Sequence, residues 1–451
     1  MLAFTRREGE EVVIGDPAAP LGIVRVSSIK GDRVRLAFDF SREIPVNRRE
    51  VADQINSNQP GKDGNPIDGQ SPPASTPLSS PQKVNPSNRF GWDYRALGAQ
   101  FPKLPFAITD AHSHVNGGRA SAMLREAMDL FGMGSIWSMT YLEQVPAVRA
   151  ELGDRLRLIA VPDFASKDRK YALGAGFLER IGQYHELGSR LCKIWAAPRS
   201  VDYAIEAGDA TMFELDAPIR IAAMDMATKL GMSLMVHIAD PDTWFQTRYS
   251  DAARYGTKSA QYLPLERLLD RFTAPWLAAH MGGWPEDLNF LTGLLDRHPN
   301  LFLDTSATKW ILREISKHPA GAVQNFLERF RGRILFGSDI VTTDEHMIAG
   351  ESKSEMAAKA SRPEDAFDLY ASRYWALRTL WESRFDGESP IADPDLAMVD
   401  PKRFSAMDAP RLRGQHLPAS LLKSLYVDAA ANFISAGASV GAARNASGQT
   451  R

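Results

Sequence analysis

The pattern of apolar and polar positions divides the chain into two parts with different periods. In residues 1–56, short apolar runs are separated by turns at Gly15-Asp16 and Gly31-Asp32, which predicts a small β domain. Strands are expected at 2–5, 12–14, 23–26, 34–38 and 44–46, followed by a short helix over about 48–55. A unit of this size has a marginal core, so we expect it to gain stability by pairing with a second copy.

From residue 89 onward, apolar runs alternate with amphipathic segments of helical period. The runs expected as strands lie at 106–109, 135–139, 158–161, 191–195, 233–236, 276–279, 301–303 and 334–336. Eight strands that alternate with helices are typical of an α/β fold of the (β/α)8 TIM-barrel type. A doubly wound sheet is the structural alternative.

The segments outside these two parts are poor in large apolar side chains. Residues 57–88 are rich in Gln, Asn, Ser, Gly and Pro, which predicts a disordered, flexible linker. The barrel is therefore expected over 89–436, with a disordered tail at 437–451. The stretch 344–407 is longer than a closing barrel needs, and its pattern fits either a packed cap or a lid that shapes the pocket.

Composition and charge narrow the function classes. The 451 residues carry a formal net charge of −2, which provides no overall attraction to nucleic acid or to a membrane. The single cysteine, Cys192, excludes an intramolecular disulfide and a cysteine-based zinc site. A charged N-terminus and the lack of an apolar run of about 20 residues predict a cytoplasmic protein without a membrane partner.

Polar side chains follow several of the predicted barrel strands. His112 and His114 follow the first strand two residues apart, so their side chains face the same space. His237 ends the fifth strand and Asp339 follows the eighth, and catalytic groups of such barrels gather at the C-terminal ends of strands. These four side chains predict one divalent metal ion, with Zn²⁺ as the expected ion and an open position for water.

Each of these residues suggests a chemical role. A metal ion would lower the pKa of water, and Asp339 can then accept the proton as general base. His280, after the sixth strand, is expected to hydrogen-bond the attacked oxygen or the water, with a structural role as the alternative. Lys193, in the fourth strand, is a candidate contact for a substrate carboxylate or a second metal. Further possible substrate contacts are Trp244, Arg248 and Arg373.

The order of residues in the first part resembles a known family. Residues 1–10, 14–16, 31–36 and 44–51 resemble the CsrA (carbon storage regulator) family. The resemblance implies a strand-swapped homodimer that regulates translation by binding GGA-containing hairpin loops in messenger RNA leaders. It places the RNA contacts on Phe4, Arg6, Arg7 and Arg48. A module that only dimerises the enzyme is the alternative.

The second part resembles another family. Residues 110–114, His237, 279–283, 303–306 and 336–339, together with 417–432, resemble the amidohydrolase superfamily, in the branch that includes aminocarboxymuconate-semialdehyde decarboxylase. The resemblance implies a mononuclear, often zinc-containing site for hydrolysis or non-oxidative decarboxylation. Binuclear members carry a carboxylated lysine at the end of the fourth strand, near the place of Lys193, but we expect one metal here.

Two functional hypotheses follow from the chain as a whole. The first is a metal-dependent hydrolase of a small carboxylated or cyclic substrate, fused to an RNA-binding module; a decarboxylase would use the same metal site. The second is an RNA-binding translational regulator whose barrel is not catalytic.

Overall fold

The computed structural model describes residues 7–16, 19–30, 33–40, 85–209, 211–319, 321–349 and 355–448. The chain divides into two units, Met1–Ser80 and Pro81–Arg451, which are described separately. The strands predicted at 2–5 and 44–46 and the helix predicted at 48–55 lie outside the described residues. The same holds for Phe4, Arg6 and Arg48, so the structure describes only Arg7 of the predicted RNA contacts.

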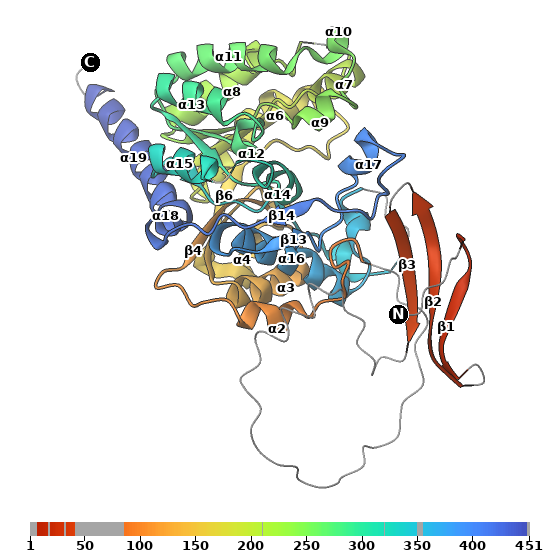
Figure 1. Ribbon diagram of the computed structural model, residues 1–451. Helices are drawn as coiled ribbons and strands as arrows, with labels where there is room; N and C mark the ends of the chain where they lie inside the picture. The colour runs from red at the N-terminus through yellow and green to blue at the C-terminus, as the bar shows by residue number, and fades with distance from the viewer. Residues whose placement is uncertain are drawn as a thin grey trace. The chain divides into compact units, whose positions relative to one another are not determined.

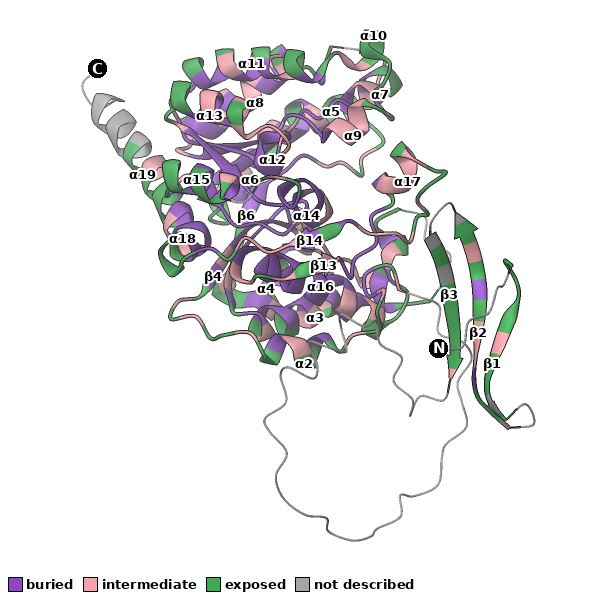
Figure 2. Cartoon of the chain, viewed as in Figure 1, coloured by how far each residue is buried: buried purple, intermediate pink, exposed green. Residues whose placement is uncertain are grey.

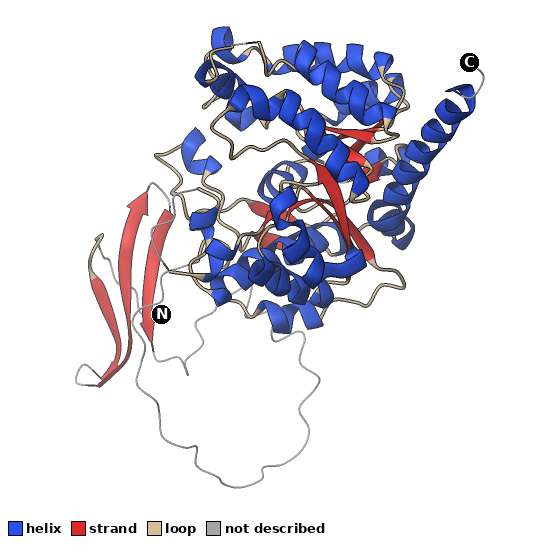
Figure 3. Cartoon of the chain, turned by 180° about the vertical axis from the view of Figure 1, so that it is seen from behind, coloured by secondary structure: helices blue, strands red, loops and turns tan. Residues whose placement is uncertain are grey.

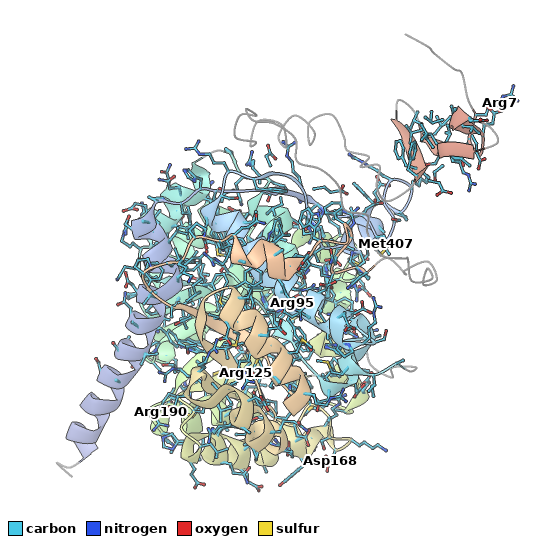
Figure 4. The ribbon with its side chains drawn as sticks, turned by 90° about the horizontal axis from the view of Figure 1, so that it is seen from below. Arg7, Arg95, Arg125, Asp168, Arg190 and Met407 are labelled. Carbon is cyan, nitrogen blue, oxygen red and sulfur yellow. The ribbon has the colours of Figure 1, made fainter. Side chains whose placement is uncertain are left out.

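The first unit contains a three-stranded antiparallel sheet in the order β1-β2-β3 (Figure 1). Its strands are β1 (Glu11–Asp16), β2 (Ala19–Lys30) and β3 (Arg33–Phe40). The three central strands expected from the sequence are thereby confirmed. Arg7 precedes β1 at the edge of this unit and is exposed to solvent (Figure 4).

One face of this small sheet is apolar across all three strands. Val24 pairs with Val12 on one side and with Phe38 on the other, and Val26 pairs with Leu36. Paired residues share a face of a sheet, so these side chains form one continuous apolar surface. Leu36 is 45% and Phe38 50% exposed within the unit (Figure 2). A surface of this kind favours contact with another apolar surface.

The second unit is a barrel of parallel strands. The sheet order is β11-β10-β9-β8-β7-β6-β5-β4-β12, and the pairs within it are parallel. All eight predicted strands are confirmed within a few residues. The strands are β4 (Ile108–His114), β5 (Met133–Ser138), β6 (Leu156–Ala160), β7 (Leu191–Trp195), β8 (Ser233–His237), β9 (Trp276–Ala278), β10 (Leu301–Asp304), β11 (Ile334–Leu335) and β12 (Ile340–Val341).

The barrel closes through two short strands that follow each other in the chain. β11 pairs with β10, whereas β12 pairs with β4. Between them, the Ala111 amide donates to the Phe336 carbonyl (2.9 Å) and the Asp339 amide donates to the His112 carbonyl (2.8 Å). The last strand is thus interrupted beside the end of β4, and the closed circle excludes the doubly wound alternative.

Helices follow the strands and surround the barrel (Figures 1 and 3). They bury the apolar strand residues in one continuous core. The helices are α2 (Tyr94–Ala99), α3 (Gly118–Leu130), α4 (Val145–Leu152), α5 (Arg169–Leu173), α6 (Ala175–Glu186), α7 (Ser200–Glu206), α8 (Pro218–Lys229), α9 (Asp242–Phe245), α10 (Ala252–Tyr255), α11 (Lys258–Arg271), α12 (Ala279–Gly282), α13 (Leu288–Arg297), α14 (Thr308–Ile315), α15 (Ala322–Arg329), α16 (Pro363–Glu382), α17 (Asp395–Val399), α18 (Ala419–Lys423) and α19 (Ala429–Gly448). Within the described residues, no helix has the length and apolar character needed to cross a bilayer.

The stretch 344–407, expected as a cap or a lid, is largely packed. Helix α16 is buried along most of its length and packs against α3 and α14. The hairpin of β13 (Asp386–Glu388) and β14 (Arg411–Arg413) follows it, and the short turns η3 (Asp344–Met347) and η4 (Ala357–Lys359) precede it. The packed-cap interpretation therefore holds for α16.

The boundaries of the barrel unit differ from those expected. Asn88 donates to the Asp368 carboxylate (2.9 Å), and the Pro86 carbonyl accepts from the Ala392 amide (2.7 Å). The last residues of the predicted linker, 85–88, therefore belong to the barrel unit. At the other end, α19 continues to Gly448, where a disordered tail was expected from 437. This tail is rich in alanine, whose helix propensity outweighs the lack of large apolar side chains.

A buried ion-pair network fixes the start of α17 and the residues before it to the barrel. Arg313 on α14 contacts the carboxylates of Glu314 (2.5 Å), Asp393 and Asp395 (3.4 Å), and it donates to Thr243 (3.0 Å). The side chains of Arg313, Glu314 and Asp393 are at most 2% exposed. Carboxylates buried this deeply need a cationic partner.

We predict that Arg313→Met lowers the free energy of unfolding of the barrel by about 3–5 kcal/mol, because it leaves the fully buried Asp393 carboxylate without its ion-pair partner. Tryptophan fluorescence during urea unfolding measures this unit alone, since all nine tryptophans lie in it. The control Arg329→Met removes an exposed pair with Asp296 and should cost less than about 1 kcal/mol. Equal losses in the two variants would contradict the assigned role of the network.

Candidate active site

Three of the predicted metal-binding side chains converge where the barrel closes. His112 and His114 lie two residues apart on β4, so their side chains point to the same side of the strand. His112 is fully buried, and the two ring centroids are 5.8 Å apart. The Asp339 carboxylate lies 3.3 Å from Nε2 of His114 and 3.6 Å from Nε2 of His112. Asp339 adopts a left-handed backbone conformation (φ 59°) in the gap between β11 and β12. This conformation directs its carboxylate toward the two imidazoles.

The surroundings of His112 fit a metal ligand. Its Nδ1 is 2.9 Å from the Asp304 carboxylate, whereas its Nε2 is buried without a hydrogen-bond partner. Histidines that bind metals commonly donate the other ring N–H to a carboxylate, which leaves a lone pair directed at the ion. Among the described residues, His112, His114 and Asp339 form one group whose ligand atoms lie close enough to bind a single ion.

A second possible group contains His112, His280 and Asp304, but the Asp304 carboxylate is already occupied. It accepts from the His280 amide (2.9 Å) and from the Ser306 amide (3.0 Å), and it contacts the Ser306 hydroxyl. Burial acts to raise the pKa of Asp304, but the neighbouring His112 holds that pKa well below its usual value. Asp304 is therefore an anionic support for His112.

His237 lies beside this group but is turned toward another carboxylate. Its Nε2 is 2.8 Å from Oδ1 of Asp240, and the Tyr249 hydroxyl donates to the other oxygen (2.7 Å). The ring centroids of His237 and His280 are 4.6 Å apart. In this arrangement Nδ1 of His237 is the nitrogen left to act as a ligand.

His280 is held rigidly beside His112. It has a left-handed backbone (φ 59°), and its Nδ1 is 2.8 Å from the Ser306 hydroxyl. Burial, with a further contribution from His237, lowers the pKa of His280 well below its usual value. The imidazole is therefore neutral near pH 7, and because the Ser306 hydroxyl donates to Asp304, the single N–H of His280 is on Nδ1 and its Nε2 can accept a hydrogen bond.

Lys193 lies within β7 and is 4% exposed. Burial lowers the pKa of Lys193 to about 8, although Asp304 and Asp339 act to raise it. Lys193 lines the same cavity as His114 and Asp339, so its predicted place beside the metal-binding residues agrees with the structure. Whether it contacts a substrate or a second metal stays a prediction.

Asp110 organises the end of β4 without contributing to the ligand group. Its carboxylate accepts from the Ser338 amide (3.0 Å) and hydroxyl (2.6 Å), from the Tyr374 hydroxyl (3.0 Å) and from the His112 amide (3.3 Å). Burial raises the pKa of Asp110 to about 7 despite these donors. Asp110 thus ties β4, α16 and the gap that contains Asp339 together.

The protonation states in the ligand group suit a cation. Burial, with Lys193, lowers the pKa of His112, which keeps the imidazole neutral. For Asp339, burial acts to raise the pKa, but His114, His280 and His112 together hold it well below the usual range. Neutral imidazoles and an ionised carboxylate are the forms that bind metal ions.

A cavity of about 880 Å³ opens above these residues. Besides the candidate ligands, it is lined by three side chains that the sequence suggested as substrate contacts: Trp244, Arg248 and Arg373. The sequence analysis did not predict that Asp240, Asp304 and Ser306 support the histidines. The polar run 304–306 directly after a predicted strand could have indicated this role for two of them.

Two family profiles match the chain. The profile described as the CsrA "Global regulator protein family" matches residues 1–57, and the profile described as "Amidohydrolase" matches residues 202–371. The translational regulator CsrA of Rhodopirellula baltica is 40% identical over 65 residues, which are 14% of this chain and 87% of that protein. The CsrA of Desulfitobacterium hafniense (strain Y51) is 47% identical over 55 residues, which are 12% of this chain and 66% of the relative.

Solved structures resemble the barrel at low sequence identity. A probable 2-pyrone-4,6-dicarboxylic acid hydrolase from Acinetobacter baumannii is 12% identical, with a TM-score of 0.35 over 59% of this chain and 92% of that one. An amidohydrolase from Burkholderia multivorans is 10% identical, with a TM-score of 0.34 over 73% and 99%. Both scores lie below 0.5, so the barrel assignment rests on strand order and pairing.

The N-terminal match covers most of the Rhodopirellula regulator, and the second profile spans β8 to β11 and the residues that close the barrel. The chain therefore belongs to the CsrA family through its N-terminal segment, and residues 202–371 of its barrel unit match the amidohydrolase profile.

Proposed function

We propose that the barrel is a metal-dependent hydrolase of a small carboxylated or cyclic substrate. The observation that supports this proposal most strongly is the buried Nε2 of His112, which has no partner and lies beside His114 and Asp339. Leaving a buried polar atom unpaired costs about 1–3 kcal/mol, which a bound cation would offset. We infer that His112, His114 and Asp339 hold the ion and that Nδ1 of His237 is the fourth ligand.

Each residue of the site then has its own role in the proposed reaction. A bound divalent ion, with Zn²⁺ as the favoured one, supplies a Lewis acid and an acidified water. Asp339, which stays ionised, accepts a proton from the attacking water. His280 is neutral; its Nδ1–H donates to the Ser306 hydroxyl, which itself donates to Asp304, so its Nε2 is left to accept a hydrogen bond from the attacking water. Lys193 holds a substrate carboxylate beside the site.

A decarboxylase is the second candidate for the same residues. The buried Lys193 favours it, because an ammonium group beside the ligand group can orient a carboxylate. Product analysis with a substrate labelled in its carboxylate carbon separates the two: release of labelled CO₂ supports decarboxylation, and its retention in the product supports hydrolysis.

We further propose that the CsrA segment binds messenger RNA with GGA-containing hairpin loops as a homodimer. Membership of the CsrA family supports RNA binding, with contacts from Phe4, Arg6, Arg7 and Arg48. The exposed apolar face around Phe38 supports dimerisation, since a second copy would cover it.

Metal analysis of full-length protein purified without chelator should give about one equivalent of a divalent ion for the wild type. Asp339→Asn should lose most of it, because the variant removes the anionic ligand. Asp304→Asn should weaken metal binding about 10–100-fold through the orientation of His112. The control His185→Asn lies on α6, away from the cavity, and should keep the ion. Wild-type protein without metal, or Asp339→Asn with a full equivalent, contradicts the proposal.

In a gel-shift titration with a GGA hairpin, the double variant Arg6→Ala/Arg48→Ala should bind at least about tenfold more weakly than the wild type, because each arginine supplies about 1–3 kcal/mol of base recognition. The control Arg25→Ala removes an exposed arginine that is paired with Glu11 and should bind like the wild type. Equal affinities of the wild type and the double variant would argue against specific recognition.

Light scattering coupled to size-exclusion chromatography should give the mass of two chains for the full-length protein. Phe38→Glu should shift it to one chain, because a charge cannot be buried without cost in an apolar interface. The control Asp39→Lys changes the neighbouring residue on the opposite face of β3 and should remain dimeric. Dimeric Phe38→Glu, with unchanged tryptophan fluorescence of the barrel, would exclude this face as the interface.

A further inference from the structure

We propose that Lys309, Lys359 and Arg373 form a second anion-binding site in the cavity, which holds an additional negatively charged group of the substrate. The proposal rests on the proposed function, since it concerns the substrate of the same cavity. It assigns to the barrel a substrate with at least two anionic groups, one at the metal-binding end and one at these three cations.

The three cations come from separate elements that meet at the cavity. Lys309 lies on α14, Lys359 ends η4 and Arg373 lies on α16. All three line the same cavity as His112 and Asp339. Two of the three therefore come from the stretch after β12 that is longer than a closing barrel needs.

None of the three has a carboxylate oxygen within 4.0 Å among the described residues. Lys359 contacts the sulfur of Met356 (2.8 Å), and Arg373 donates through Nη1 to the hydroxyls of Ser87 (2.8 Å) and Ser372 (2.9 Å). Within the part of the chain that the structure describes, their positive charges thus have no carboxylate in ion-pair contact.

Three other buried cations of this barrel are paired. Lys258 contacts Asp242 (2.8 Å), and Arg378 contacts Glu382 (2.5 Å). Arg313 is also surrounded by carboxylates. Partly buried cations without a partner are costly, and they are typical of places where a ligand supplies the missing charge.

The three cations also repel one another. Burial lowers the pKa of Lys359 to about 8, with Lys309 and Arg373 lowering it further and Asp339 and Glu355 acting in the opposite direction. Burial likewise lowers the pKa of Arg373 to about 10. A bound anion would relieve this repulsion and favour the charged forms.

Glu355 also lines the cavity and is exposed, whereas three other nearby carboxylates are engaged elsewhere. Asp395 accepts from the indole N–H groups of Trp244 (2.8 Å) and Trp310 (3.0 Å) and contacts Arg313, and Asp393 contacts Arg313. Asp339 belongs to the proposed metal site. These three carboxylates are therefore paired with groups other than Lys309, Lys359 and Arg373.

The donor geometry suits a carboxylate or a similar oxyanion. Ser87 and Ser372 orient the guanidinium of Arg373 through Nη1, which leaves Nε and Nη2 as donors for two oxygens of one anion. Lys309 and Lys359 add two flexible point charges. Ser87 belongs to the stretch 85–88 that precedes the predicted barrel, so this end of the linker helps to build the site.

The test is calorimetric titration of the full-length, metal-loaded protein with linear dicarboxylates from malonate to suberate, each compared with its monomethyl ester. At least one dicarboxylate should bind about tenfold or more tightly than its ester, the size of one charge-assisted hydrogen bond. Lys309→Met/Lys359→Met should abolish that difference and leave the affinity of the esters unchanged. The control Arg329→Met/Arg331→Met removes two exposed arginines on the barrel surface and should keep it.

Two results would overturn the proposal. One is a wild type that binds no dicarboxylate better than its ester, and the other is a lysine variant that keeps the preference. Metal content and tryptophan fluorescence, measured on the same samples, distinguish this failure from others. Wild-type protein that takes up no metal counts against the proposed function, whereas metal-replete, folded protein without the preference counts against the anion site alone.

Discussion

The hydrogen bond from the Asp339 amide to the His112 carbonyl is the contact on which the site depends. It joins the interrupted last strand to β4 at the point where the barrel closes, and it holds Asp339 in a left-handed conformation. The contact that closes the barrel therefore also places Asp339 beside the two histidines. Asp110 reinforces the same junction by accepting from both sides of it, from the amides of His112 and Ser338.

Carboxylates behind the imidazoles complete this arrangement. Asp304 orients His112, Asp240 orients His237, and Ser306 connects His112 with His280. Such partners fix which ring nitrogen carries the proton, so the protein decides which nitrogen faces a metal ion. In our proposal, the cations of the cavity wall bind a negatively charged group of the substrate, and the histidines bind the ion. The same histidines and supporting carboxylates would serve hydrolysis or decarboxylation.

The sequence predicted the barrel well, because each strand is a compact apolar run buried on both sides. It also predicted the neighbourhood of His112, His114 and Asp339, because parallel strands bring their C-terminal ends together. The hydrogen bond between His237 and Asp240 could not be foreseen, since it depends on the path of a loop. The cation cluster was hidden as well: of Lys309, Lys359 and Arg373 only the last was singled out, because separate elements bring the three together. Local composition misjudged the chain at both ends of the barrel unit, where tertiary contacts and alanine content order residues that lack large apolar side chains.

The central claim is that one ion is held at the junction of β4 and the last strand. The most direct measurement is a crystal structure of the full-length protein with the metal identified by anomalous scattering at its absorption edge. The account predicts a single peak bound by Nε2 of His112, by His114 and by Asp339, with Nδ1 of His237 completing the set. An ion bound elsewhere in the cavity, or a metal-replete protein in which Nε2 of His112 faces no ion, would contradict it.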